Sequence, residues 1–364
     1  MDSPSIGIYV PDWKLKPPIK QRESTMEIMR IGLDLAKNVF EVFGIDKQEQ
    51  LLLRKVLKRN KVLAFFSQLD PCIVGIESCG GAHYWGRELR KLGHEVRMMA
   101  PQFVAPYRKG QKNDRNDAEA ICEAAGRPNM RFVPIKNEEQ QSVLTVHRAR
   151  SLLVGERTAL VNQVRGFLTE YGIVLPAGRS QVRSQLPRIL EDAENALPHL
   201  ARDVFSDQYT RLCELDRVIG GYDRKIETMA KAQEVTKRLM QLEGVGPLTA
   251  TALVATVGDI REFKNGRQFA AWLGLVPKQW SSGGKVRLGR ITKRGDVYLR
   301  TLLIHGARSA MRYAENKDDR KSQWVKAVRE RRGFNKAAVA LAAKHARILW
   351  SMLSKGTEYQ LVKA

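Results

Sequence analysis

The sequence of 364 residues has few cysteines and no long apolar run, and both absences narrow the class of protein. Its cysteines are scattered and form no pair at the short spacing of a zinc site: Cys72, Cys79, Cys122 and Cys213. We therefore expect reduced, partly buried thiols of a cytosolic protein rather than a disulfide framework. No apolar stretch approaches the ~20 residues that span a bilayer, and no basic amphipathic segment dominates, so a membrane partner is not expected.

A signal peptide and a phosphate-binding loop are also missing. Residues 1–25 have no apolar core followed by a cleavage site, and they precede a second methionine, Met26. They contain several prolines and lysines without periodicity, so we expect a disordered extension or a misassigned start. No Gly-x-x-x-x-Gly-Lys-Ser/Thr stretch occurs, which argues against chemistry driven by ATP.

Acidic residues are too few to balance the basic ones. There are 62 lysines and arginines against 39 acids, for a net charge of +23 and a pI near 10.0. Such an excess predicts a polyanionic partner, most simply nucleic acid. Residues 241–364 hold 24 basic and 9 acidic residues, or +15 of the total, so the positive charge is concentrated at the C-terminal end of the chain. The chain is long enough for two or more domains.

Four acids stand in the N-terminal third where strands are expected to end or a helix to begin: Asp34, Glu77, Asp114 and Asp117. The first two end the apolar runs 28–33 and 72–76, which predict buried strands. The other two lie three residues apart at the start of a predicted helix, so they face the same side. Neighbouring strands lie about 4.8 Å apart, which lets carboxylates at two strand ends share an ion.

Oxygen ligands of this kind suit Mg²⁺, with Mn²⁺ as the alternative ion. Two such ions activate an attacking oxygen and stabilise a leaving one. Each acid taken alone has an ordinary explanation, because acids form turns after strands and Asp114 is a normal residue at a helix N-terminus. Their order and spacing together favour a metal site that acts on a nucleic-acid phosphate.

The hydrophobic pattern predicts a mixed α/β domain followed by helices. Predicted strands cover residues 28–34, 39–45, 50–56, 72–77 and 95–99. Predicted helices cover residues 62–69 and 83–92, with a third that starts at Asp114. An early meander followed by alternating strands and helices implies a mixed sheet covered by helices, the topology expected of a ribonuclease-H-like nuclease core.

Two long helical stretches follow, at residues 138–171 and about 203–242, and together predict an antiparallel coiled arm. Four arginines lie between the apolar positions of the first: Arg148, Arg150, Arg157 and Arg165. They form either a solvated face or a groove for nucleic-acid backbone. Such an arm could equally join subunits.

Residues 239–259 are typical of a helix-hairpin-helix, with Gly244-Val245-Gly246 between two helices and Pro247 at the start of the second. A glycine turn there exposes backbone N–H groups that bind phosphate without reading sequence. An ordinary tight turn between helices is the alternative. Basic side chains that are expected to bind nucleic acid follow it: Lys278, Lys285, Arg287, Arg290, Lys293 and Arg294.

The segment Trp280–Gly284 carries two hydroxyls, Ser281 and Ser282, and its composition predicts a flexible turn. A serine is a poor nucleophile unless a base, a metal or nearby positive charge activates it. Composition alone therefore favours a linker.

The motifs taken together closely resemble the DEDD-type transposases of insertion-sequence family one-ten. They are IGLDLAK, GIESCGG, KNDRNDA, LEGVGPLTA and QFAAWLGLVPKQWSSGGKVRLGRITKRGDVYLR. The resemblance covers nearly all of the chain from Met26 onward. It implies a RuvC-like domain at residues 26–136, a helical coiled-coil linker at 137–238 and a mainly helical transposase domain with the helix-hairpin-helix at 239–364.

The resemblance also assigns roles to residues and partners. It places the family's four metal-binding acids on Asp34, Glu77, Asp114 and Asp117, and its nucleophilic serine on Ser282, with Ser281 as the alternative register. It implies that a structured bridge RNA chooses donor and target DNA by base pairing, so the protein reads mainly backbone and shape. Acids and serine on different domains imply a composite site in a homo-oligomer, from dimer to tetramer. We expect a cytoplasmic, nucleoid-associated prokaryotic protein.

The resulting hypothesis is a Mg²⁺-dependent, RNA-guided site-specific recombinase in which Ser282 forms a transient phosphoserine. Three other functions stay open at this point. A RuvC-like nuclease would use metal-activated water, and a non-enzymatic protein would only bind nucleic acid. An actin-like ATPase is suggested solely by the strand and turn of IGLDLAK.

Overall fold

A computed structural model describes residues 27–111 and 113–360 of the chain. The expected disordered extension at residues 1–25 lies outside the described residues. The chain divides into two compact units, one up to Ile135 and one from Lys136 onward. Within the described residues, no helix is both long and apolar enough to cross a bilayer.

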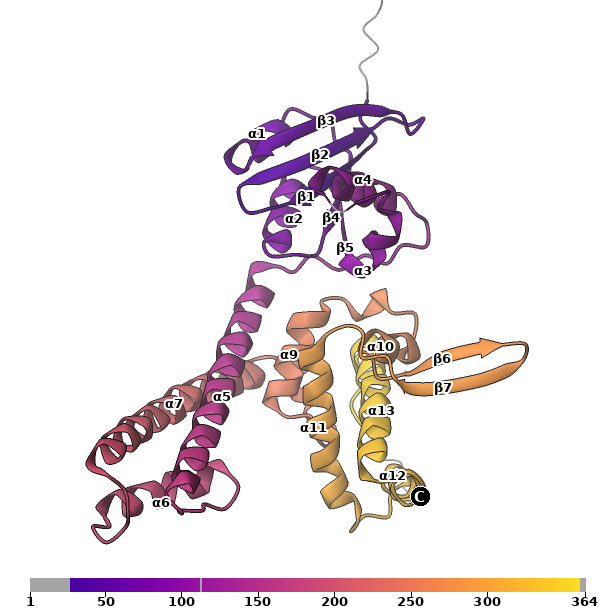
Figure 1. Cartoon of the computed structure of the whole chain (residues 1–364). Coiled ribbons are helices and arrows are strands. Elements are labelled where there is room, and N and C mark those ends of the chain that lie inside the picture. The colour runs from indigo at the N-terminus through magenta and orange to yellow at the C-terminus, as the bar shows by residue number, and fades with distance from the viewer. Residues whose placement is uncertain (1–26, 112, 361–364) are drawn as a thin grey trace, which may run out of the picture. The chain divides into compact units, whose positions relative to one another are not determined.

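The first unit is built on a five-stranded mixed sheet in the order β3-β2-β1-β4-β5. Its strands are β1 (Arg30–Leu35), β2 (Val39–Ile45), β3 (Leu51–Lys58), β4 (Ile73–Glu77) and β5 (Glu95–Met99). The strands β1, β2 and β3 form an antiparallel meander, whereas β1, β4 and β5 are parallel (Figure 1). The predicted mixed α/β fold is therefore confirmed.

Helices cover this sheet, and one of them lies unusually close to it. The helices of the unit are α1 (Val62–Phe66), α2 (Ala82–Lys91), α3 (Pro101–Val104) and α4 (Asp114–Ala125). Side chains alternate along a strand, so Ile31 and Leu33 of β1 enter a fully buried core while Gly32 and Asp34 face α4. A Cβ atom on Gly32 would lie 2.0 Å from the carbonyl oxygen of Ala118 in α4. Glycine thus allows α4 to approach the sheet.

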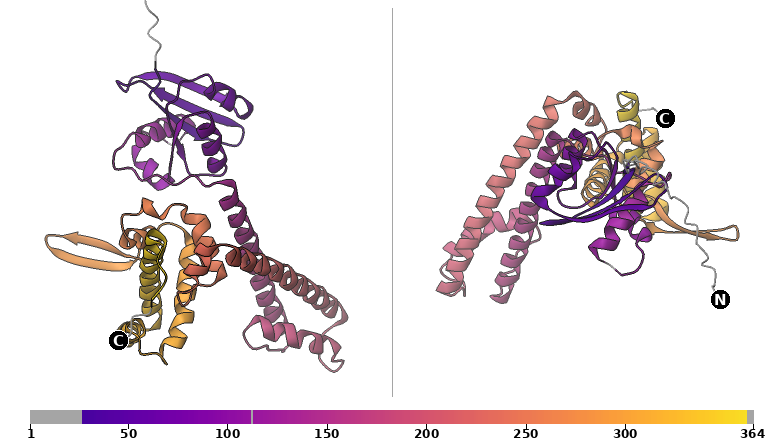
Figure 2. Two further views of the ribbon diagram at one scale, coloured as in Figure 1. Left: turned by 180° about the vertical axis from the view of Figure 1, so that it is seen from behind. Right: turned by 90° about the horizontal axis from the view of Figure 1, so that it is seen from above.

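The second unit begins with a helical arm. Its helices are α5 (Glu138–Glu170), α6 (Arg179–Glu191) and α7 (His199–Ala232). The helices α5 and α7 run side by side and antiparallel (Figures 1 and 2), joined by ion pairs of Arg150 with Asp223 and of Arg157 with Asp216. These two arginines therefore hold the arm together, an arrangement that neither sequence interpretation anticipated.

The predicted helix at about 203–242 is interrupted in the structure, and α6 was not predicted. The helix α7 ends at Ala232, Gln233 is extended, and α8 runs over Glu234–Leu239. The hydroxyl of the buried Thr236 donates hydrogen bonds to the carbonyls of Ala230 and Gln233 across this break. A side chain that bonds the backbone in this way competes with continuation of the helix.

The rest of the second unit is a helical bundle that carries one hairpin (Figure 1). Its further helices are α9 (Pro247–Val257), α10 (Gly266–Trp272), α11 (Val297–Ala314), α12 (Arg320–Arg332) and α13 (Phe334–Lys355). They share one apolar core that includes Leu253, Phe269, Leu303 and Leu349. The hairpin strands are β6 (Pro277–Ser282) and β7 (Lys285–Ile291). A mostly helical C-terminal part was expected and is confirmed.

Candidate metal centre and serine hairpin

Three of the predicted metal ligands meet at the end of β1. One carboxylate oxygen from each of Asp34, Asp114 and Asp117 lies within 4.8 Å of the others. The second and third belong to the first turn of α4, where the side chain of Asn113 caps the helix by accepting a bond of 2.8 Å from the amide of Asn116. The cap fixes where the helix begins, and the three-residue spacing then turns both acids toward β1.

Glu77 reaches the same edge of the sheet from the neighbouring strand. Leu33 and Ile76 are partners in the parallel β1–β4 ladder, and the next residues on the two strands are Asp34 and Glu77. Its negative charge contributes to the raised pKa of Asp34. Glu77 is not one of the three acids within 4.8 Å of one another. The structure thus gathers three of the four predicted acids and places the fourth on the adjacent strand.

Burial and the nearby negative charges raise the pKa of Asp34 to about 6. Burial is the largest cause, followed by the charges of Asp114, Asp117 and Glu77, while a backbone hydrogen bond at Leu35 acts in the opposite direction. A bound cation would offset this repulsion. The donors are all oxygens and only partly buried, so they suit a hard divalent ion that keeps some positions for water and phosphate.

Arg108 is a neighbour of this cluster that the sequence analysis missed. Its guanidinium donates a hydrogen bond of 3.1 Å to Asp117, and both side chains are mostly buried. The ion pair orients the carboxylate of Asp117 within the cluster. No spacing rule identifies Arg108, because it lies in a loop before α4.

Gly32→Ala is expected to disrupt the metal centre without changing any acid. The added methyl group would meet the carbonyl of Ala118 at 2.0 Å, so α4 must move away from β1 together with Asp114. Overpacking of this kind costs about 1–3 kcal/mol, which urea unfolding will measure, and the affinity of the acid cluster for a divalent cation should fall with it. The matched control is Gly80→Ala, where a Cβ atom has no neighbour within 4 Å. Equal binding of a divalent cation by both variants would contradict this role of Gly32.

The serine segment forms a tight hairpin, which corrects the expected flexible turn. Gly283 and Gly284 connect β6 to β7 with φ values of 54° and 75°. Two positive φ values are the mark of a turn whose twist matches that of paired strands, and glycine adopts them without strain. Both strands are exposed along almost their whole length.

Strand register separates the two serines. Ser282 pairs with Lys285 and Trp280 pairs with Arg287, so these four side chains share one face of the hairpin. Ser281 pairs with Val286 on the opposite face, where its hydroxyl accepts a hydrogen bond of 2.8 Å from Gln279. Ser282 therefore shares its face of the hairpin with two cations, Lys285 and Arg287, and is the cross-strand partner of the first.

The six predicted nucleic-acid-binding cations are all exposed. Four lie on the hairpin, and Lys293 and Arg294 follow it before α11. The glycines of the predicted helix-hairpin-helix differ from each other. Gly244 has a φ of 83° and packs directly against Gly306 of α11, whereas Gly246 is exposed at the start of α9. Gly244 thus has a packing role, and only Gly246 presents its backbone to solvent.

Comparison with known proteins matches both units. A model of the transposase IS116/IS110/IS902 family covers residues 236–323, and a DEDD-type IS110 transposase model covers residues 31–173. A probable family 20 transposase of Pseudomonas aeruginosa is 52% identical over 336 residues, which are 92% of this chain and 99% of the relative. The transposase of insertion sequence IS1111A from Coxiella burnetii is 43% identical over 361 residues, or 99% of each chain.

This chain belongs to the IS110/IS116 transposase family. The family predicted from the sequence motifs is confirmed. The protein is an enzyme that cuts and joins DNA strands, so the interpretations as a non-enzymatic binding protein and as an ATPase do not hold. The three gathered aspartates and the serine hairpin fall within the two matched regions of the transposase.

Proposed function

We propose that this transposase is a Mg²⁺-dependent recombinase guided by a bridge RNA, with Ser282 as its nucleophile. The observation that carries the proposal is the convergence of Asp34, Asp114 and Asp117 within 4.8 Å. The strand order 3-2-1-4-5, with acids at the ends of β1 and β4, supports a RuvC-like assignment for residues 26–136. Mg²⁺ bound by these acids, or Mn²⁺ in its place, would activate the attacking oxygen and stabilise the leaving one.

The hairpin supplies the nucleophile. The Oγ atom of Ser282 attacks the scissile phosphate and gives its proton to solvent water. A new O–P bond forms, the bond from phosphorus to one sugar oxygen breaks, and that oxygen leaves with the electron pair and takes up a proton from water. The cations of Lys285 and Arg287 on the same face bind the phosphate and favour the deprotonated hydroxyl. The phosphoserine conserves the energy of the broken bond, so strands are exchanged without ATP.

Acids and serine belong to separate units, so we propose a composite site that forms between subunits of a dimer or tetramer. The arm at residues 137–238 would join the subunits. Gly246 and the six exposed cations would bind the nucleic-acid backbone, since phosphate contacts give affinity without base specificity. Gly244 would act only by keeping the turn packed against α11.

Target choice is expected to follow the RNA and not the protein. Purified transposase, Mg²⁺ and the structured RNA transcribed beside its gene should recombine donor and target DNA, whereas omission of the RNA should abolish the product. Changing the RNA segment that pairs with the target should redirect insertion to the new complementary sequence, read by sequencing of the junctions. Insertion at an unchanged site would contradict RNA guidance, because base pairing must then play no part in selection.

A RuvC-like nuclease that uses metal-activated water is the second candidate. The acid cluster favours it as much as it favours a recombinase, since metal-bound water needs no serine. The role of Ser282 distinguishes the two candidates.

A further inference from the structure

A pocket lies in the second unit between α12, α13 and the segment Thr357–Gln360 that follows them. Its volume is about 350 Å³, within the range of sites that hold small organic molecules. It is remote in sequence from the serine hairpin and contains none of the residues proposed above for catalysis or backbone binding. The functions already assigned to the transposase therefore leave it unexplained.

The wall formed by the C-terminal segment is anchored. The backbone amide of Tyr359 donates a hydrogen bond of 3.0 Å to the side chain of Gln241, and the carbonyl of Gly356 accepts one of 2.8 Å from Arg238. Tyr359 also packs against the core cluster that contains Met352. The tyrosine ring is thus held in place as one side of the pocket.

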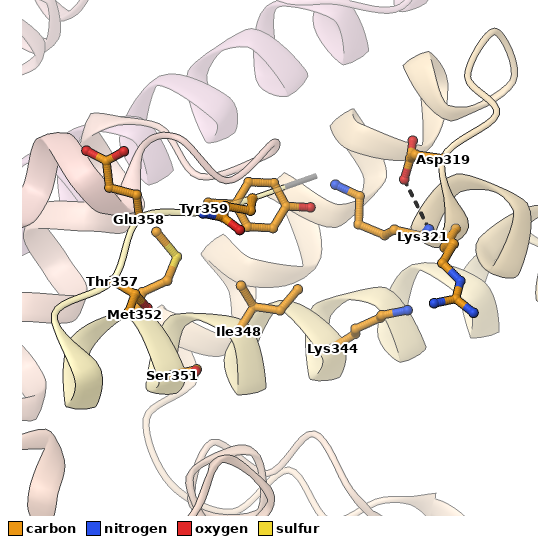
Figure 3. A pocket seen from close by; sticks show the side chains of 11 residues that line it. Asp319, Lys321, Lys344, Ile348, Ser351, Met352, Thr357, Glu358 and Tyr359 are labelled. Carbon is orange, nitrogen blue, oxygen red and sulfur yellow. Dashed lines mark hydrogen bonds between the residues drawn. The ribbon is translucent and has the colours of Figure 1, made fainter. Parts of the chain in front are cut away.

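The two ends of the pocket differ in chemistry (Figure 3). Tyr359 and Ile348 lie between Glu358 on one side and Lys321 with Lys344 on the other. The middle is therefore aromatic and aliphatic, while one end is cationic. The ammonium of Lys321 lies 5.3 Å from the centre of the Tyr359 ring. The pocket therefore offers an aromatic surface for a planar group, and beside it a cationic end that accepts an anion attached to that group.

The cations at that end are not equally neutralised. The ammonium of Lys321, only 8% exposed, donates a bond of 2.7 Å to Glu243. Lys344 has no acid partner among the described residues, and its ammonium nitrogen lies over the ring of Trp324, 4.4 Å from the ring centre. Burial and the charges of Arg347 and Lys321 lower its pKa. An anion beside Lys344 would relieve this excess of positive charge.

Asp319 also lies at the cationic end of the pocket, but its carboxylate does not neutralise Lys344. Asp319 caps α12, and its carboxylate accepts bonds of 3.0 Å from the amide of Lys321 and 3.1 Å from that of Ser322. The same carboxylate accepts a bond from the hydroxyl of Ser322. It is therefore committed to the helix start, and Arg320 beside it adds a further cation without an acid partner among the described residues.

We propose that this pocket holds one unpaired nucleotide of a nucleic-acid strand, with the base against Tyr359 and Ile348 and the phosphate on Lys344 and Arg320. A base in a paired duplex cannot enter, because both of its faces are already stacked on neighbouring bases. Stacking on an aromatic side chain combined with a phosphate contact is the general chemistry of single-strand binding. The proposal requires only that the transposase binds nucleic acid, and it does not depend on the chemistry of Ser282.

The full-length protein and short fluorescein-labelled oligonucleotides test this assignment. Lys344→Gln and Tyr359→Ala should each weaken binding of a single strand by about tenfold and leave binding of a duplex of the same sequence unchanged. Tyr359→Phe should bind like the wild type, since the ring is kept. Lys355→Gln removes the same charge from the end of α13, outside the pocket, and serves as the control. Measuring single-stranded DNA and single-stranded RNA separately shows for which of the two the variants lose more affinity.

A second measurement uses the unaltered protein and so does not depend on how the variants fold. A single strand that carries 5-iodouracil should crosslink on irradiation to the peptide that contains Tyr359, identified by mass spectrometry. Crosslinks that map only to other peptides would overturn the proposal. It would equally be overturned if Lys344→Gln matched Lys355→Gln, or if single-stranded and duplex binding fell together. Both experiments measure binding, so their results do not depend on whether the protein carries out strand transfer.

Discussion

Asp34→Asn is expected to abolish DNA cleavage and at the same time to stabilise the metal-free transposase at pH 8. The substitution replaces a carboxylate by a neutral amide and so removes one negative charge from the cluster of Asp34, Asp114 and Asp117. Loss of a residue that only hydrogen-bonds to a metal ligand lowers activity ~10–100-fold. Loss of a ligand itself should lower the rate of DNA cleavage by more than that. The melting temperature in EDTA should rise by about 3 °C or more, because a neutral amide costs less to bury than a carboxylate and no longer repels its neighbours.

The stabilisation should depend on pH with a defined sign. Folded Asp34 keeps its proton up to about pH 6, whereas its unperturbed pKa is 3.8. Between these values the folded state binds more protons than the unfolded state, so the free energy of unfolding falls as pH rises. The advantage of Asp34→Asn over the wild type should therefore be absent near pH 4, grow up to about pH 6 and stay constant above it.

Melting curves from pH 4 to pH 8, with EDTA and then with Mg²⁺, measure both effects. Mg²⁺ should raise the melting temperature of the wild type and leave that of Asp34→Asn almost unchanged, because a ligand stabilises only the state that binds it. Asp70→Asn, an exposed acid of the same unit outside the cluster, controls for the loss of one charge. A lower melting temperature for Asp34→Asn at pH 8 would show that burial and neighbouring charges do not destabilise the ionised Asp34 carboxylate.

The order of elements in the first unit could be predicted because each strand carries its own signal. Val39–Ile45 and Glu95–Met99 agree in full with the structure, since a short run of apolar and β-branched residues between turn formers specifies a strand locally. The helix after Asp114 likewise begins at its capping signal, Asn113. Local chemistry therefore sufficed to place the acids at the ends of their elements.

Contacts between distant segments could not be read in the same way. The approach of α4 to β1 depends on Gly32 meeting Ala118, and nothing in the sequence pairs these two positions. The pocket wall at Tyr359 is of the same kind. The pairing of Arg108 with Asp117 spans only nine residues, but the loop between them has no pattern that predicts it. Glycines 283 and 284 carried a correct turn signal, but flexibility was inferred where strand pairing on both sides makes the turn tight.

Ser282→Ala is expected to abolish formation of a covalent protein–DNA adduct, whereas Ser281→Ala should keep it. If Ser282 is the nucleophile, its loss should reduce strand transfer on the order of 10⁴-fold or more, because the remaining groups cannot form the bond to phosphorus. Ser281 lies on the other face of the hairpin with its hydroxyl bonded to Gln279, so its removal should change the rate less than about tenfold.

Both variants, with Mg²⁺, RNA and end-labelled DNA, are to be compared on denaturing gels, where an adduct migrates with the protein and disappears on protease treatment. Each substitution removes one serine hydroxyl, and the two positions are adjacent and exposed. Each variant therefore controls for the effect of the other on hairpin folding. If the Ser282→Ala variant still cuts DNA, and neither variant forms an adduct, water is the nucleophile and the hairpin only binds the strand. If Ser281→Ala alone loses the adduct, the face that bears Lys285 and Arg287 is not the face that meets the phosphate.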